Sequence, residues 1–297
     1  MTKLFRRVFA PLAALVAFLP SGAAARQTVA RPALWEVTDP DTTIYLFGTI
    51  HLLPENTAWR TAAFDRAVAG SQQLVLETIV DDKDPTKLMS AMASLGFKAG
   101  LPPLAERVPA AKRAALAAAI KKSGYPPQAF DRMKTWTAAF ILLGNQFKDL
   151  GLKGGEGVET VLRKDFTASG KPVGELESNL DQLSFFDKLP ESAQVDLLEG
   201  AIEQGKAMSA EWAGMLGAWS RGDVAGIAKT FNKDLAGSPA LRDILIRQRN
   251  ANWSRWIEQR MTQPGAIMIA VGAGHLAGKS SVLEMLKNEG YSVRRLQ

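Results

Sequence analysis

The two histidines of this chain stand at equivalent positions in two short motifs. These motifs are Gly48-Thr-Ile-His51-Leu52 and Gly272-Ala-Gly-His275-Leu276, and the 297 residues contain no other histidine. A glycine three residues before a histidine permits a positive φ angle or a close backbone approach, which lets the imidazole point into a crevice. Imidazole is a common metal ligand and acid–base group. A single histidine of this kind is often a core or capping residue, whereas the matched pair favours a functional role.

Carboxylates must complete any metal site, because two imidazoles are too few ligands for a catalytic metal. Glu77 and Glu177 each follow a short apolar run, at residues 73–76 and 171–176. If those strands run parallel to the strands before the histidines, all four side chains project at one sheet edge, where ligands of α/β sheets bind. The alternative for either glutamate is a solvated surface position.

Arg249 is the third candidate of the site. Its guanidinium suits a substrate carboxylate or a developing oxyanion. The alternative is a surface cation near Glu258 or Asp243, which its position in the sequence allows equally well.

The two motifs lie in the same order of elements: strand, Gly-x-x-His, helix, strand. The first unit has strands at 43–47 and 73–76 around a helix at 57–68, and the second has strands at 266–271 and 291–296 around a helix at 280–288. We expect residues 34–37 to form a hairpin with 43–47, since Asp39 and Pro40 between them favour a turn. Further helices are expected at 110–122, 126–147, 157–168, within 180–231, and at 240–261. We therefore predict an α/β fold, a mixed, largely parallel central sheet flanked by helices, with a helical insertion between the two units.

The amino terminus has the layout of a secretory signal. Lys3, Arg6 and Arg7 precede an apolar run at 8–19, and small residues follow at 21–25. We expect cleavage after Ala25 and a periplasmic or secreted protein; the alternative is an uncleaved membrane anchor. No later stretch is long and apolar enough to cross a membrane, so no stable membrane span is expected after cleavage.

Composition narrows the classes of function. The formal charge of +6 includes three bases of the signal segment, and the small remainder makes nucleic acid an unexpected partner. Cysteine is absent, which excludes disulfides, thiolate nucleophiles and Cys-ligated metals. The 46% of hydrophobic residues is enough for a full core.

Short stretches spread over nearly the whole mature chain resemble the TraB/GumN family, and residues 26–297 are identified as a single domain of it. The stretches are Leu34-Trp-Glu-Val37, Tyr45 to Pro54, Leu74-Val-Leu-Glu77, Gly170-Lys-Pro-Val173, Leu176-Glu-Ser178 with Gln182, Arg249-Asn250 with Trp253, Val271 to Leu276, and Gly290-Tyr291. One departure is Glu159, which stands where the resemblance leads us to expect an aspartate.

The resemblance implies a place among the Tiki metalloproteases, the erythromycin esterases and the haem-binding ChaN proteins. It points to His51, His275, Glu77 and Glu177 as ligands of a divalent metal, with Arg249 beside them. Our leading hypothesis is a hydrolase that uses Mn²⁺, Co²⁺ or Zn²⁺ on a peptide or small-molecule substrate with an amide, peptide or ester bond. In that hypothesis a glutamate not bound to metal accepts a proton. The alternatives are a metal-independent, esterase-like hydrolase and a periplasmic protein that binds haem or another small ligand.

Overall fold

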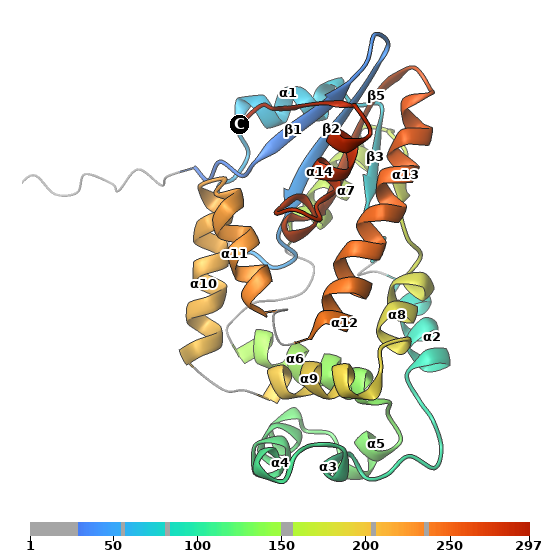
Figure 1. Ribbon diagram of the computed structural model, residues 1–297, viewed down its shortest axis with the longest axis vertical. Helices are drawn as coiled ribbons and strands as arrows, with labels where there is room; N and C mark the ends of the chain where they lie inside the picture. Colours follow the sequence, from blue (N-terminus) through green and yellow to red (C-terminus); the bar gives the residue numbers. More distant parts are fainter. Residues whose placement is uncertain (1–28, 55–56, 81–83, 150–156, 203–205, 235–237) are drawn as a thin grey trace, which may run out of the picture.

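A mixed β-sheet forms the centre of the protein in the computed structural model (Figure 1). The structure describes residues 29–54, 57–80, 84–149, 157–202, 206–234 and 238–297, so the expected signal segment lies outside the described residues. The strands of the sheet have the order β4-β3-β5-β2-β1-β6. Their bounds are Leu34–Thr38 (β1), Thr42–Thr49 (β2), Gln73–Leu76 (β3), Val173–Glu175 (β4), Gly265–Gly272 (β5) and Ser292–Arg295 (β6). The predicted fold class is confirmed.

The two histidine motifs lie side by side because the strands before them pair directly. β2 and β5 are parallel, with Gly48 opposite Val271 and Thr49 opposite Gly272. β3 is parallel to β5 on its other side, and β4 is parallel to β3. Only β1 runs against the other strands, since it is antiparallel to both β2 and β6. The carboxyl ends of four adjacent parallel strands therefore meet at one edge.

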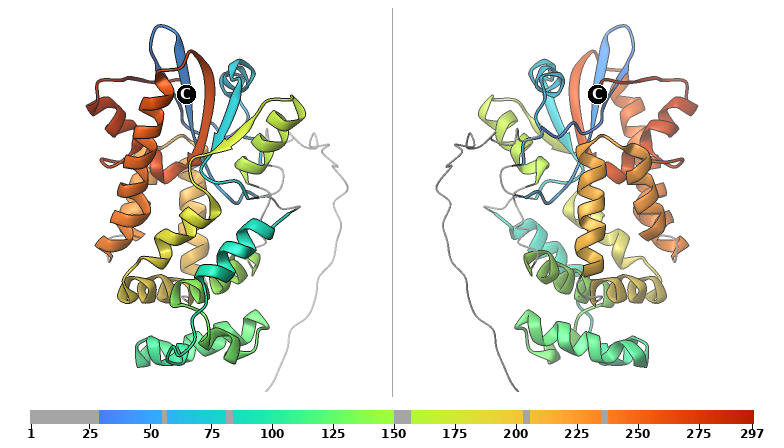
Figure 2. Two further views of the ribbon diagram at one scale, coloured as in Figure 1. Left: turned by 90° about the vertical axis from the view of Figure 1, so that its right-hand side faces the viewer. Right: turned by 90° about the vertical axis from the view of Figure 1, so that its left-hand side faces the viewer.

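Alternating side chains of the strands build a hydrophobic core on each face of the sheet. Met268 and Ala270 of β5 pack on one face, and Ile267 and Ile269 pack on the other. The first face is covered by α1 (Ala62–Gly70), α7 (Val158–Ala168), α10 (Lys206–Ser220) and α11 (Val224–Asp234), and the second by α13 (Arg249–Met261) and α14 (Val282–Asn288). Figure 2 shows α7 and α13 on opposite sides of the strands.

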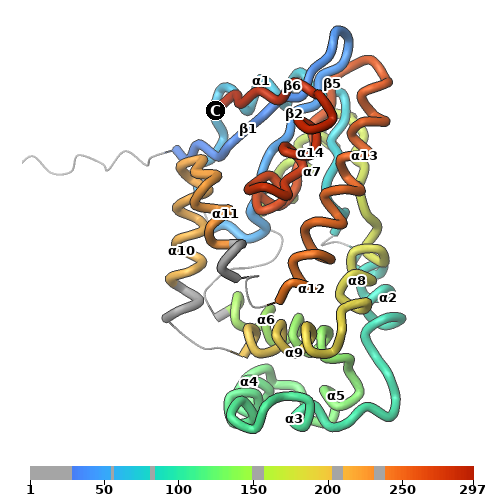
Figure 3. The backbone as a smooth tube through the Cα atoms, viewed as in Figure 1, coloured from blue at the N-terminus to red at the C-terminus, as the bar shows by residue number. Residues whose placement is uncertain are grey.

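The helical insertion packs around cores of its own. Between β3 and α7 it contains α2 (Thr86–Leu95), α3 (Leu104–Arg107), η1 (Ala110–Lys112), α4 (Arg113–Ser123), α5 (Pro127–Asp131) and α6 (Thr135–Asp149). After β4 come α8 (Asn179–Asp187), α9 (Glu191–Ile202), α12 (Pro239–Arg242) and the π-helical turn η2 (Asp243–Gln248). The backbone tube in Figure 3 shows α3, α4 and α5 at the end of the molecule away from the sheet. No described helix has the length and apolar character needed to cross a membrane.

Three sequence predictions differ from the structure. The helix expected at 126–147 divides into α5 and α6, because the backbone between them pairs with the segment after α2: Lys98 N–H donates to the Arg132 carbonyl, and Lys134 N–H donates to the Gly96 carbonyl. The helix expected at 57–68 begins only at Ala62, where the Thr61 side chain caps it. The last strands of the two units also differ: β3 lies beside β5, whereas β6 lies at the far edge, beside β1.

Candidate functional site

Glu77 and Glu177 are neighbours at the carboxyl edge of the sheet. Parallel pairing continues past the ends of β3 and β4: Leu176 N–H donates to the Leu76 carbonyl at 2.9 Å, and Glu177 N–H donates to the Glu77 carbonyl at 3.1 Å. Ser178 then starts α8 with a capping box, which fixes the backbone beside Glu177. The structure thus places both glutamates at the edge where the histidine motifs lie, as their positions after apolar runs indicated.

Arg249 forms buried ion pairs with both glutamates. Its Nε lies 3.1 and 3.0 Å from the two carboxylate oxygens of Glu177, and its Nη2 lies 2.8 Å from Glu177 Oε2. Nη2 also donates to Glu77 Oε1. The three side chains are only 6–8% exposed. Arg249 is therefore not the surface cation of the alternative interpretation, and Asp243 pairs with Arg247 instead.

Local structure helps to aim Arg249. It directly follows the π-helical turn Asp243–Gln248, and such turns often mark functional sites. Its Nη1 donates to the Leu245 carbonyl within that turn at 3.3 Å. Its guanidinium lies 4.8 Å from the ring centre of Trp253, and the indole N–H of Trp253 donates to Glu177 Oε1 at 2.9 Å. The guanidinium is held from several sides.

The pKa values of the two glutamates respond differently to this environment. Burial alone would raise the pKa of Glu77, but the charge of Arg249, with smaller contributions from the two histidines, lowers it to about 2. Burial raises the pKa of Glu177, and the hydrogen bonds from Arg249 and Trp253 oppose that rise. Glu77 is thus firmly ionised at neutral pH.

His275 is a buried, neutral imidazole with a defined tautomer. Its Nδ1 lies 2.7 Å from Asn250 Oδ1. The Asn250 amide nitrogen donates to the Ser280 carbonyl at 2.7 Å, so Asn250 Oδ1 acts as acceptor and the proton sits on His275 Nδ1. Nε2 then carries the lone pair, which faces Arg249 Nη1 at 3.2 Å. Burial lowers the pKa of His275 to about 3.

His51 lies at the entrance of the site, with 66% of its side chain exposed. Its Nδ1 lies 2.7 Å from Glu159 Oε1, which also accepts a hydrogen bond from Thr49. The charge of Glu159 raises the pKa of His51 to about 9. Sequence reasoning noted Glu159 only as a departure from the family pattern, although α7 brings it against His51. Gly157 makes this approach possible, since a Cβ there would lie 2.1 Å from the His51 carbonyl oxygen.

Three predicted side chains converge around Gly272. A Cβ added at this glycine would lie 3.5 Å from Glu77 Oε2, 3.6 Å from His275 Cδ2 and 3.8 Å from His51 Nε2. The Gly272 N–H donates to Glu77 Oε2 at 3.2 Å, and Gln182 donates to Glu77 Oε1 at 2.9 Å. The side chains from opposite ends of the chain thus surround one small space.

A cleft of about 290 Å³ opens beside this space. His51, Glu77, Glu159 and Gln182 supply polar groups to its wall, and the other lining residues are Leu52, Leu76, Thr78, Val80, Thr160 and Arg163. A concave, largely apolar wall with a few convergent polar groups is typical of small-molecule sites.

The donor chemistry around Gly272 fits a divalent transition metal. His51 and His275 each have Nδ1 at an oxygen acceptor, the arrangement that orients histidine ligands, and Glu77 adds an ionised carboxylate. Glu177 fits this role less well, because Arg249 and Trp253 hold its oxygens and it belongs neither to the groups around Gly272 nor to the lining of the cleft. Among the residues that the structure describes, no three His, Asp or Glu side chains already stand at metal-binding spacing, so binding requires side-chain movement, for which the exposed His51 has room.

Comparison with known proteins places the chain in a family. The model of the TraB/PrgY/gumN family matches residues 33–295. Two similar relatives are the uncharacterized protein YbaP of Escherichia coli K12 and that of Shigella flexneri, each 25% identical over 248 residues, which cover 82% of this chain and 87% of the relative. No solved structure matches the chain. Because the family model covers nearly all of the described sheet and its site, the chain belongs to the TraB/PrgY/gumN family.

Proposed function

We propose that the protein is a divalent-metal-dependent hydrolase of peptide, amide or ester bonds. The observation that carries this proposal is the convergence of His51, Glu77 and His275 around the space beside Gly272. Two imidazoles and one carboxylate form a ligand set known from catalytic zinc sites. A bound Mn²⁺, Co²⁺ or Zn²⁺ would polarise a carbonyl group and acidify a water molecule there.

The surrounding side chains orient the histidine rings whose nitrogen atoms would bind the metal. Glu159 and Asn250 hold Nδ1 of His51 and His275, respectively, so that only Nε2 of each ring remains for a ligand. At neutral pH His51 holds a proton, because Glu159 raises its pKa to about 9. His51 would have to lose that proton to serve as a ligand, so metal binding would release it. Arg249 then supplies one positive charge against three carboxyl groups, because Glu77 and Glu177 contact its guanidinium and Glu159 contacts His51. This imbalance favours a dication.

Arg249 and Glu177 act in this proposal as positioning residues. Both are buried and use their polar atoms on each other, on Glu77 and on Trp253. Arg249 keeps Glu77 ionised and in place, and Glu177 keeps Arg249 oriented. The substrate or oxyanion contact that the sequence suggested for Arg249 stays a prediction. The positioning role is supported by the 6% exposure of the side chain and by its absence from the residues that line the cleft.

The second candidate is hydrolysis without a metal. It is favoured by the ionisation states at the cleft, where a protonated His51 and an ionised Glu77 have pKa values pushed far apart, as in acid–base pairs. In this version His51 Nε2 donates a proton to the leaving group, and Glu77 orients the attacking water and accepts the proton that the water loses. Arg249 Nη1 then keeps its contact with His275 Nε2.

Metal analysis and hydrolysis assays on protein purified without a histidine tag test the proposal. A tag would mask a site with two imidazoles. We expect about one divalent ion per chain, hydrolysis of model ester or peptide substrates that chelation stops and Mn²⁺, Co²⁺ or Zn²⁺ restores, and loss of both properties in His51→Ala and in His275→Ala. Glu175→Gln is a matched control, because Glu175 ends β4 next to the site but lines a different pocket.

The outcomes separate the candidates. Activity that survives exhaustive chelation but disappears in His51→Ala supports the metal-independent version. Metal binding and activity retained in both histidine variants contradict both versions. Titration with haemin, followed by a shifted Soret band that one histidine variant loses, would instead support the ligand-binding alternative.

We also propose that the protein is exported and cleaved after Ala25. The charged, apolar and small-residue segments of residues 1–25 support this proposal. Fractionation of the producing cells, with mass measurement of the mature amino terminus, tests it. A full-length chain in the cytoplasm would contradict export.

A further inference from the structure

The positive charge of the protein is concentrated in one part of the helical insertion. Residues 96–134, which we name the basic lobe, include α3, η1, α4 and α5. They contain eight Lys or Arg and two Asp or Glu, a formal net charge of +6 that equals the charge of the whole chain. The other residues therefore sum to zero, and a modest average charge conceals a strongly basic region.

Several cations of the basic lobe face solvent. Lys112 and Lys134 are engaged with Glu199 and Asp187 at 3.7 and 2.5 Å, and Arg107 donates to backbone carbonyls. In contrast, four exposed cations make no ion pair with any residue that the structure describes. These four are Lys98, Arg113, Lys121 and Arg132. Such charges remain available to a partner.

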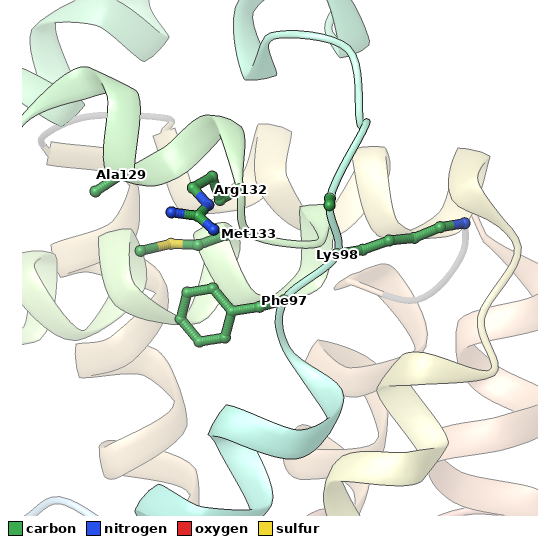
Figure 4. A pocket seen from close by; sticks show the side chains of 6 residues that line it. Phe97, Lys98, Ala129, Arg132 and Met133 are labelled. Carbon is green, nitrogen blue, oxygen red and sulfur yellow. The ribbon is translucent and has the colours of Figure 1, made fainter.

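Apolar groups are exposed beside two of these cations, Lys98 and Arg132. A cavity of about 450 Å³ is lined by Phe97, Lys98, Ala99, Ala129, Arg132 and Met133. Figure 4 shows the Arg132 guanidinium close to the Phe97 and Met133 side chains, with Lys98 extending away from them. Phe97 is 47% exposed, and Tyr125 of the same lobe is 53% exposed.

We propose that the basic lobe docks on a membrane surface rich in anionic phospholipid. Lys and Arg attract anionic headgroups, while exposed aromatic side chains enter the boundary between headgroups and acyl chains. A purely polar polyanion would satisfy the cations but leave Phe97, Tyr125 and the apolar cavity in water. An amphiphilic surface satisfies both, and the largely apolar cavity has room for part of an acyl chain beside the Arg132 guanidinium.

The lobe is separate from the candidate site. α3, α4 and α5 lie at the end of the molecule away from the strands in all views (Figures 1 and 2), and none of the cleft-lining residues belongs to residues 96–134. Docking through the lobe therefore leaves the cleft uncovered. The inference does not depend on the proposed hydrolysis.

Vesicle co-sedimentation of the full chain tests the proposal. Vesicles of phosphatidylcholine alone are compared with vesicles that also contain phosphatidylglycerol. The test variant is Lys98→Glu/Arg132→Glu. The matched control is Arg66→Glu/Arg255→Glu, which makes the same charge change at exposed positions of α1 and α13. All the proteins retain residues 1–25, so differences between them report the lobe.

We expect the wild type to prefer vesicles with phosphatidylglycerol and to be partly released by high salt, because salt screens the attraction of the cations but not the contact of the aromatic side chains. The loss of two surface cations weakens such binding by ~25-fold, so the test variant falls at least that far while the control stays within a few-fold of the wild type. Phe97→Ser should remove the binding that persists at high salt. Circular dichroism and melting temperature confirm that each variant folds.

Three results would overturn the proposal: equal binding to both vesicle types, an equal loss in the test and control variants, or no vesicle binding by the wild type. In the last case, binding to poly-glutamate that Lys98→Glu/Arg132→Glu abolishes would assign the lobe to an acidic protein partner instead.

Discussion

We predict that Gly272→Ala leaves the stability of the fold nearly unchanged but strongly lowers metal binding and hydrolysis. The backbone at Gly272 has φ −49° and ψ 131°, which alanine adopts without strain. The added methyl would meet Glu77 Oε2, His275 Cδ2 and His51 Nε2 at 3.5, 3.6 and 3.8 Å, ordinary van der Waals distances. Reduced freedom of the unfolded chain stabilises such a variant by about 0.4–1 kcal/mol, so the free energy of unfolding should change by no more than about 1 kcal/mol.

Metal binding and hydrolysis, in contrast, should decrease strongly in Gly272→Ala. The methyl occupies the space that His51, Glu77 and His275 share, where an ion or a reacting carbonyl must enter. Because misplacement by about 1 Å can cost 100-fold in rate, we expect hydrolysis and metal binding to fall by about 100-fold or more. Urea unfolding followed by tryptophan fluorescence measures the stability, and metal analysis with the hydrolysis assay measures the function.

Two other glycine-to-alanine variants serve as controls. Gly200→Ala adds a methyl into open space and should leave stability and activity near wild type. Gly157→Ala places Cβ 2.1 Å from the His51 carbonyl oxygen and should destabilise the fold. If Gly272→Ala folds normally and keeps full activity, the shared space is not where the chemistry occurs, and the proposed site is refuted.

Three further predictions concern the charges of the site. The folded-state pKa of Glu77 is about 2 against an ordinary 4.5, so its ionised form contributes about 3 kcal/mol. This contribution is complete above pH 4.5 and is lost as the pH falls toward 2. Urea unfolding of the metal-free proteins should show this loss of stability in the wild type and not in Glu77→Gln. If the free energy of unfolding depends on pH in the same way in both proteins, the prediction is wrong. Arg249→Met leaves the Glu77 and Glu177 carboxyls buried without their cation and should lower the free energy of unfolding by about 3–5 kcal/mol; a loss below about 1 kcal/mol would argue against the buried ion pairs. Glu159→Gln removes the charge that raises the pKa of His51 to about 9, so the NMR titration midpoint of His51 should move down toward 6.5; an unchanged midpoint would show that Glu159 does not set it.

The sequence alone was sufficient for the outline of the site. Apolar runs of strand length that end in Gly-x-x-His or in glutamate indicated strands whose carboxyl ends meet, and the parallel pairing of β2, β5, β3 and β4 confirms that arrangement. The repeated motif also supported the family, which the match over residues 33–295 confirms. These inferences succeeded because the length and apolar character of a strand, and the residue that ends it, can be identified from the local sequence. The catalytic and metal-binding roles of His51, His275, Glu77, Glu177 and Arg249 stay predictions.

The tertiary structure decided which groups neutralise and orient these side chains. Arg249 pairs with Glu77 across 172 positions and with Glu177 across 72, while Glu159 reaches His51 only because α7 packs against the sheet. The sequence spacing of Arg249 permitted nearby surface partners equally well. Such pairs depend on how helices dock on a sheet, and docking follows the fit of whole hydrophobic faces rather than any local motif.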